Sequence, residues 1–494
     1  MLGLKRIVLL FFFILFTISF CTLDNQNPKS PDSSVTKLLA LNFLAIASTN
    51  SCLNSAGSFW VRNITSSTQT SSCVSANLVS SSSTLDIYVQ KTLSLNLNFA
   101  AIASTYTNQI LPAEISALGV ASDINRDGKI TLLILDIVDG ASVGTGFIAG
   151  FVDPVNFFQD NAVFATRSNE REILYLDGVE LVKLRDRDLA LNRPDPFLST
   201  LAHELQHLIR FQHSQGNDDP WIDEGTSEVI SDITGFGPQS ARLACFRGDI
   251  SSSTSCSGGI GSTSTSSPSL FKWNGNLKNY AFSYSFMRYL YDSSGSSAAA
   301  RNLFFMDTVK GLNKVRGDNA TNLTQLFMNS PGYNASVLSS TNQIVFQRLF
   351  ASFLAQSVGY PNLNQVYIGN TNSVDLDFVR TTYPFSTTLS TLPTPQPFNA
   401  ISASTSHVLA PSQVNRVLGT TSGITNGLTN FIAIQGSDSY LIFNANNLSA
   451  ATTQIAQTNF LDSNSNDKIC PHVFLSNDMK QQNNTKKRKM ISLE

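Results

Sequence analysis

PFLSTLAHELQHLIRFQH, residues 196–213, is the stretch that decides the fold. Its apolar residues recur at helical spacing; they are Phe197, Leu198, Leu201, Ala202, Leu205, Leu208 and Ile209. Asp195 can cap this segment, and Pro196 suits its first position, where a missing backbone N–H costs nothing. The pattern predicts one amphipathic helix that packs against a core.

This helix contains HELQH, in which two of the five histidines of the chain stand four residues apart around a glutamate. Such a triple arises by chance at a rate of roughly one in a thousand. Residues i and i+4 lie about 40° apart around a helix, so both imidazoles can reach one Zn²⁺. Zinc lowers the pKa of its bound water, and an adjacent carboxylate can take and return the proton. We therefore predict His203 and His207 as zinc ligands and Glu204 as general base and acid, against the alternative of a His-Glu-His triple without metal.

Catalytic zinc needs a third protein ligand, and His213 is one candidate. HELQHLIRFQH comes close to the metzincin pattern HExxHxxGxxH, but Arg210 stands where that pattern has glycine. If the helix continues through Arg210, His213 lies about 80° away from His203 and nearly three turns further along, where it misses the metal. The chain also has no methionine between His213 and Met287 for a metzincin Met-turn.

Glu224, in WIDEGTSE (residues 221–228), is the other candidate and the one we favour. A second helix, over about 222–233, can bring its carboxylate across to the first. Glu228, four residues later on the same face, could accept a hydrogen bond from a zinc-bound histidine and orient it. A swap of roles between Glu224 and Glu228 remains open.

The block from STLAHELQHLIRF to WIDEGTSEVISDI resembles the gluzincins, and most closely the hyicolysin family of secreted bacterial metallopeptidases. The similarity extends over roughly residues 115–300. It implies an α+β fold with a thermolysin-like catalytic domain, one catalytic Zn²⁺ and endopeptidase activity on protein or peptide substrates. Gluzincins commonly stabilise the oxyanion with a tyrosine or histidine downstream of the ligands. On the helix expected at 280–291, Tyr280 and Tyr284 are the candidates, and the resemblance favours Tyr284; a plain core role is the alternative.

A second metal motif is DINRDG, residues 123–128, which opens the strand expected at 129–138. Asp123, Asn125 and Asp127 occupy the first, third and fifth positions of an EF-hand loop, but the twelfth position is Ile134. We therefore expect a polar turn, with a structural Ca²⁺ as the lesser alternative. Another strand is expected at 172–176.

Charge and composition restrict the partners. Thirty-three basic residues against 35 acidic ones give a net charge of −2, which provides no field to capture nucleic acid, so we expect no nucleic-acid partner. The 42% of hydrophobic residues exclude disorder throughout the chain. The protein is long enough for two or three folding units.

The N-terminus predicts export. Lys5 and Arg6 precede an apolar run over 7–16 that is too short to span a bilayer comfortably. Cys21 and the polar residues after it resemble a lipoprotein junction, although Phe20 is larger than usual there. Release by ordinary cleavage and surface anchoring through a lipid on Cys21 both stay open, and such a lipid is the sole membrane contact we expect. The protein is thus expected outside the cytoplasm, where nearest-neighbour cysteines would pair as Cys52–Cys73 and Cys245–Cys256.

Composition shifts divide the chain. The expected parts are a signal peptide (1–21), an N-terminal segment of uncertain fold (22–110), the catalytic domain (111–385), a Pro/Thr-rich linker (386–397), a small β-rich C-terminal domain (398–462) and a polar tail (463–494). The main rival to a peptidase is a catalytically inactive surface adhesin that keeps the peptidase fold. The joint presence of His203, Glu204, His207 and Glu224 argues against it.

Overall fold

The computed structural model describes Cys52 and residues 57–357, apart from gaps at 67, 142–145, 163, 250–255, 258, 260–268 and 313. Beyond residue 357 it describes short strands. The chain divides into two compact units, Met1–Ser51 and Cys52–Glu494, and the first lies outside the described residues. Among the helices searched in the described part, none has both the length and the apolar character that crossing a membrane requires.

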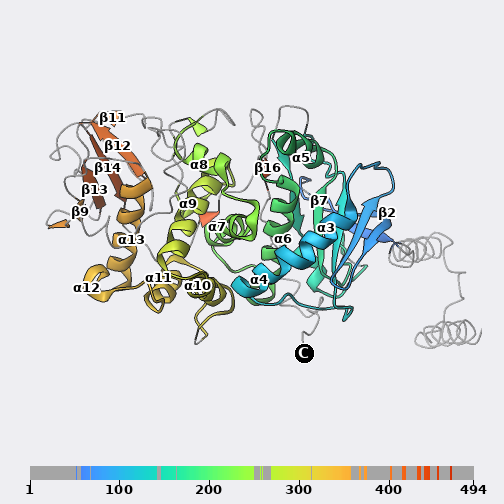
Figure 1. Ribbon diagram of the computed structural model, residues 1–494, viewed down its shortest axis with the longest axis horizontal. Helices are drawn as coiled ribbons and strands as arrows, with labels where there is room; N and C mark the ends of the chain where they lie inside the picture. The colour runs from blue at the N-terminus through green and yellow to red at the C-terminus, as the bar shows by residue number, and fades with distance from the viewer. Residues whose placement is uncertain are drawn as a thin grey trace, which may run out of the picture. The chain divides into compact units, whose positions relative to one another are not determined.

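A mixed six-stranded sheet with the strand order β1-β2-β3-β4-β7-β6 supports the site (Figure 1). Its strands are β1 (Ser58–Arg62), β2 (Ser71–Ser81), β3 (Leu85–Gln90), β4 (Ile130–Leu135), β6 (Gly150–Val152) and β7 (Ile173–Asp177). Strands β3, β4 and β7 are parallel neighbours, and β6 pairs antiparallel with β7 at the end of the order. Both strands expected from the sequence, β4 and β7, are therefore present and adjacent.

Strand β4 explains why the sheet is buried on both faces. Its sequence ITLLIL is apolar apart from one threonine, and every residue in it is buried. Leu132 and Ile134 belong to the larger hydrophobic core, whereas Leu133 and Leu135 belong to a second core. Successive side chains of a strand point to opposite faces, so β4 contributes to both cores at once.

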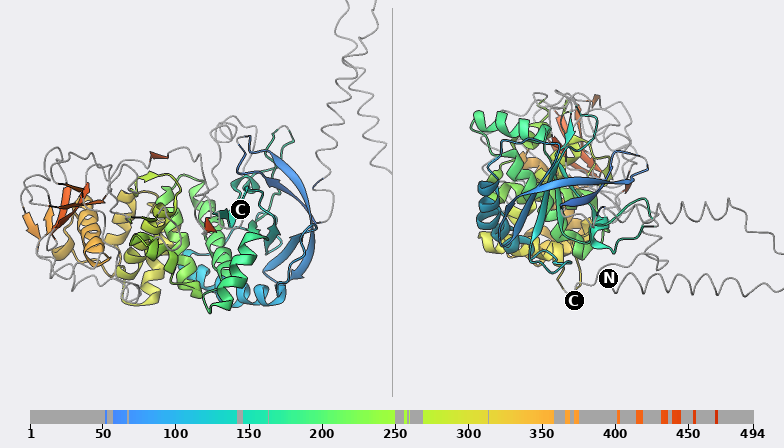
Figure 2. Two further views of the ribbon diagram at one scale, coloured as in Figure 1. Left: turned by 90° about the horizontal axis from the view of Figure 1, so that it is seen from above. Right: turned by 90° about the vertical axis from the view of Figure 1, so that its right-hand side faces the viewer.

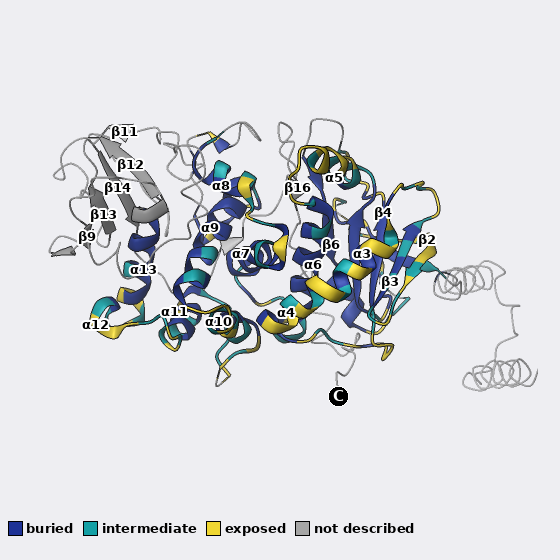
Figure 3. Cartoon of the chain, in the orientation of Figure 1, coloured by how far each residue is buried: buried dark blue, intermediate teal, exposed yellow. Residues whose placement is uncertain are grey.

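Three helices hold the site, and each lies where the sequence predicts a helix: α6 (Pro196–Ser214), α7 (Pro220–Ser231) and α9 (Leu277–Ser293). Asp195 caps α6 by accepting hydrogen bonds from the backbone N–H groups of Phe197 and Leu198. Most residues of α6, α7 and α9 are buried (Figure 3). The apolar stripe of α6 thus packs into the larger core, as its periodicity predicts.

The other described helices are α3 (Phe99–Thr105), η1 (Tyr106–Ile110), α4 (Leu111–Leu118), η2 (Pro154–Phe157), α5 (Glu180–Ala190), η3 (Asp232–Phe236), α8 (Ser240–Phe246), α10 (Ala298–Lys310), α11 (Ala320–Met328), α12 (Ala335–Leu338) and α13 (Asn342–Ser357). Figure 2 shows the strands β1–β4 and the helices α6–α10 from two further sides. This mixture of helices and sheet agrees with the expected α+β class.

One sheet crosses the boundary expected at residue 110. Strands β1, β2 and β3 come from the segment 22–110, yet they pair directly with β4 in one sheet. Residues 58–90 therefore share a sheet with a strand of the expected catalytic domain. The sequence did not indicate this because long-range strand pairing leaves no local signature.

A second six-stranded sheet follows, with the order β10-β9-β13-β14-β12-β11. It comprises β9 (Val366–Ile368), β10 (Asn372–Val374), β11 (Ile401–Ser402), β12 (Val414–Leu418), β13 (Phe431–Gln435) and β14 (Ser439–Asn444). Strands β9 and β10 precede residue 385, so this sheet begins before the expected linker. The linker at 386–397 lies outside the described residues, as do the signal segment with Cys21 and most of the tail.

Both cysteine pairs expected from spacing are confirmed as disulfides, Cys52–Cys73 and Cys245–Cys256. The first joins the segment before β1 to β2, and the second anchors the end of α8.

Candidate metal centre

Helix α6 presents both histidines of HELQH to one point. His203 and His207 lie one helical turn apart, and their Nε2 atoms are 3.1 Å from each other. His203 is 3% exposed and His207 9%. Two ring nitrogens this close require either a proton or a cation between their lone pairs.

Helix α7 adds the carboxylate of Glu224, which is fully buried. Its Oε2 lies 3.2 Å from Nε2 of His203 and 3.5 Å from Nε2 of His207. A tetrahedral zinc with ligand bonds of about 2.0–2.1 Å separates its ligand atoms by about 3.3–3.4 Å. The three distances scatter around that value, so the residues fit a zinc ion with one coordination position left for water or substrate.

Electrostatics support the same reading. Burial raises the pKa of the Glu224 carboxyl, but the adjacent His207 and His203 outweigh it and lower that pKa below its usual value. Burial lowers the pKa of His207, yet the carboxylates of Asp223 and Glu224 raise it well above the ordinary histidine value. The site therefore attracts positive charge, which a divalent metal can supply.

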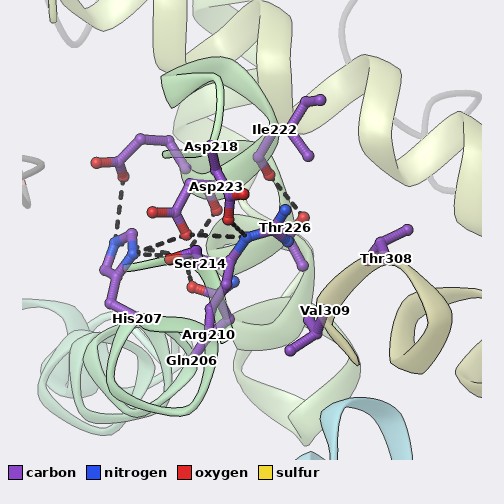
Figure 4. A network of polar contacts seen from close by, with 12 residues as sticks. Gln206, His207, Arg210, Ser214, Asp218, Ile222, Asp223, Thr226, Thr308 and Val309 are labelled. Carbon is purple, nitrogen blue, oxygen red and sulfur yellow. Dashed lines mark hydrogen bonds and ion pairs between the residues drawn. The ribbon is translucent and has the colours of Figure 1, made fainter. Parts of the chain in front are cut away.

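Asp223 orients His207, a role that the sequence did not reveal. Its Oδ1 lies 3.1 Å from Nδ1 of His207, the ring nitrogen that does not face Glu224 (Figure 4). The same oxygen is 3.7 Å from Nε of Arg210. A carboxylate on the distal nitrogen of a metal-bound histidine fixes its tautomer and raises its basicity. The sequence feature that could have indicated this role is the acidic residue directly before Glu224 in WIDEG.

Arg210 joins α6 to the segment between α6 and α7 and to the loop before α11. It is fully buried, and its Nε donates to Oδ2 of Asp218 at 2.5 Å, while Nη2 donates to the carbonyl of Gly317 at 2.9 Å. Figure 4 shows the Arg210 guanidinium next to the carboxylates of Asp218 and Asp223. The arginine that replaces the metzincin glycine is thus a structural ion-pair partner, and not only a helix-favouring residue.

His213 does not join the metal group. Helix α6 continues through Arg210 to Ser214, as the arginine predicts, and the His-His-Glu group within 4.8 Å contains His203, His207 and Glu224. His213 lies half-buried near the end of α6, and burial lowers its pKa. The described geometry therefore favours Glu224 over His213 as the third ligand.

Glu204 is fully buried on α6, where it faces strand β6. A Cβ placed on Gly150 of β6 would lie 3.1 Å from Cγ of Glu204 and 2.8 Å from the backbone oxygen of Tyr175. Only a glycine lets the strand approach the helix this closely. Gly150 therefore brings the terminal strand of the sheet beside the expected general base.

Glu228 has a different partner from the expected one. Its Oε1 accepts a hydrogen bond from Nε of Arg242 at 3.0 Å, and Nη2 of Arg242 lies 2.9 Å away. Glu228 stands one turn beyond Glu224, which moves its carboxylate by about 6 Å along α7, toward α8. Asp223, one residue before Glu224, takes the orienting position instead.

Tyr284 is also engaged elsewhere. Its hydroxyl donates to Oδ2 of Asp232 at 2.6 Å and accepts from the backbone N–H of Gln239 at 3.2 Å. Burial and Asp232 raise the pKa of Tyr284 well above its ordinary value. Tyr280 is likewise buried, under the guanidinium of Arg242 at 5.2 Å. In this arrangement the Tyr284 hydroxyl is used for packing α9 against η3, and a role toward an oxyanion would require it to leave Asp232.

Comparison with known proteins gives one informative similarity. The chain is 26% identical over 258 residues to a protein of Staphylococcus hyicus named Neutral metalloprotease ShpI. The match covers 49% of this chain and 53% of that protein, so the chain spans about half the length of the curated relative it matches. No protein-family model matches the chain.

Proposed function

We propose that this protein is a zinc-dependent endopeptidase whose metal is held by His203, His207 and Glu224. The observation that carries the proposal is the convergence of three ligand atoms at 3.1–3.5 Å from one another, at the edge lengths of a zinc tetrahedron. The similarity to a neutral metalloprotease supports the same reaction class.

Bound zinc would supply Lewis acidity, which activates water and polarises a peptide carbonyl. Glu204 lies next to His203 on the same helix, buried against Gly150. There its carboxylate can take the proton of the attacking water and deliver it to the leaving nitrogen. Asp223 holds the His207 ring so that Nε2 faces the metal position.

Strand β6 gives the substrate a place to bind. It is the last strand in the order of its sheet, and Gly150 sets it against Glu204. An extended peptide that adds to such a strand would pass the general base with its backbone aligned by hydrogen bonds.

The assignment to a group of zinc peptidases rests on which element carries the third ligand. A glutamate on the helix after HExxH is the gluzincin arrangement, and with it we propose a hyicolysin-like enzyme with a thermolysin-like catalytic domain. We also propose that the protein acts outside the cytoplasm, released or held by a lipid at Cys21. The two disulfides support this location because such bonds persist in oxidising compartments.

Cleavage of casein by the purified full-length protein tests the proposal. We expect activity that a zinc chelator abolishes, that added zinc restores, and that Glu204→Gln lowers by at least a hundredfold while zinc stays bound. His213→Ala, on the same helix but outside the metal group, is the matched control and should keep full activity. Cleavage that survives both the chelator and Glu204→Gln would rule the mechanism out. A pure, zinc-loaded protein that cleaves no tested protein would favour the adhesin alternative.

A further inference from the structure

The loop before β4 is closed by hydrogen bonds between its own residues. Oδ1 of Asp123 accepts the N–H of Gly128 at 3.1 Å, and Oδ1 of Asp127 accepts the N–H of Lys129 at 2.8 Å. Arg126 and Gly128 have φ values of +60° and +70°. The chain therefore curls between Asp123 and Lys129, and Nδ2 of Asn125 donates to Oδ2 of Asp127 at 2.7 Å.

A buried carboxylate from a distant part of the sequence reaches the same loop. Glu172 precedes β7, and its backbone oxygen accepts the N–H of Thr131 at 2.9 Å, because β7 and β4 are parallel neighbours that start at the same edge. Its Oε1 accepts the N–H of Ile124 at 2.8 Å, inside the loop. Glu172 is 1% exposed. The parallel pairing thus supplies the carboxylate that the twelfth position, Ile134, lacks.

The other oxygen of this carboxyl group lacks a hydrogen bond. Oε2 of Glu172 is buried without a hydrogen-bond partner, and so is Oγ of Ser122, at the entrance of the loop. The Ser122 hydroxyl lies close enough to favour the ionised form of Glu172, yet it completes no hydrogen bond. A buried carboxylate oxygen without a partner costs on the order of 1–3 kcal/mol or more, and a bound cation would offset that cost.

No positive charge of the described chain compensates these acids. Within the described residues, no lysine or arginine forms an ion pair with Asp123, Asp127 or Glu172. Lys129, the nearest in sequence, points away and binds Asp86 at 2.9 Å. Burial raises the pKa of Glu172, and the charge of Asp123 raises it further, which shows that the two carboxylates repel each other. A bound cation would remove that repulsion.

We propose that Asp123, Asn125, Asp127 and Glu172 bind a calcium ion that ties the loop before β4 to the start of β7. The donors are all oxygens, as Ca²⁺ prefers, and the backbone carbonyl at the seventh position, Lys129, can complete the set. The carboxylates of this loop are not among the described groups that converge within 4.8 Å, so binding draws them together. It thereby stabilises the sheet that supports β6, apart from the zinc site.

Thermal unfolding of the full-length, zinc-loaded protein tests this site. We expect 10 mM CaCl₂ to raise Tm by roughly 3–6 °C, and 10 mM MgCl₂ to raise it much less, because Mg²⁺ demands octahedral geometry. Glu172→Gln and Asp127→Asn should each abolish the calcium-dependent shift while leaving the zinc content unchanged. Asp127 is exposed, so its variant keeps the test valid if Glu172→Gln does not fold.

Asp136→Asn is the matched control. Asp136 is an exposed acid outside the loop, and its carboxylate lies within 4.8 Å of those of Asp177 and Glu180. It should retain the full calcium shift. Terbium luminescence should report one site in the wild type and none in Asp127→Asn. The proposal is overturned if calcium leaves Tm unchanged, or if both loop variants keep the wild-type shift. Neither result would bear on the zinc site, because no readout depends on catalysis.

Discussion

Replacement of Asp223 by asparagine should weaken zinc binding, although Asp223 does not contact the metal. The side chain keeps its shape and loses its charge. Its Oδ1 lies 3.1 Å from Nδ1 of His207, which puts the charge about 7 Å from a zinc ion on the other ring nitrogen. At an effective dielectric constant of about 20, that separation corresponds to roughly 5 kcal/mol between −1 and +2. Arg210, 3.7 Å from the same oxygen, cancels part of it.

We therefore expect a loss of about 1.4–2.7 kcal/mol, or 10- to 100-fold in zinc Kd, the range typical for such partners of metal-bound histidines. Competition with a chromophoric chelator measures the zinc Kd on folded protein. Glu228→Gln is the decisive comparison, because it removes the carboxylate that the sequence suggested for this role and that the structure places on Arg242. Its zinc Kd should stay within about threefold of the wild type. Weaker binding in Glu228→Gln than in Asp223→Asn would refute the reasoning.

Three further changes probe the surroundings of the site. Gly150→Ala places a methyl group 2.8 Å from a backbone oxygen of β7 and 3.1 Å from Glu204. It should lower kcat for casein cleavage and lower the free energy of unfolding in urea by about 1–3 kcal/mol, while the zinc content stays unchanged. Burial raises the pKa of Asp177 to about 7, so between about pH 4 and pH 7 the folded protein holds a proton that the unfolded chain has lost. The free energy of unfolding of the wild type therefore falls as the pH rises through this window. Asp177→Asn lacks this titration, so its free energy of unfolding, measured with urea, should rise relative to the wild type by up to about 1.4 kcal/mol per pH unit. Replacing Cys52 and Cys73 by serine opens a link of sequence separation 21 and should lower the free energy of unfolding by about 3 kcal/mol.

Local patterns in the sequence predict most of the elements near the proposed metal site. The apolar stripe with Asp195 and Pro196 defines α6 to within one residue at its end, and the arginine at position 210 correctly predicts that the helix continues. The run KITLLILDIV predicts β4. These signals are local because a helix and a buried strand each impose a short period on the chain.

What the sequence did not reveal depends on long-range contacts. The pairing of β3 with β4, which brings residues before 110 into the sheet, has no local pattern. The choice of Asp223 over Glu228 as histidine partner depends on how α7 crosses α6, because the crossing decides which turn of α7 faces His203 and His207. Tyr284 is on the expected helix, but its neighbour Asp232 comes from another element. Each of these features depends on contacts between elements that are distant in the sequence.

Anomalous diffraction at the zinc edge, on crystals of the zinc-loaded protein, tests the central claim most directly. The account predicts a single strong peak in the catalytic domain, 2.0–2.2 Å from Nε2 of His203, Nε2 of His207 and an oxygen of Glu224. A peak bound by His213 in place of Glu224, or a zinc ion away from both histidines of HELQH, would contradict it.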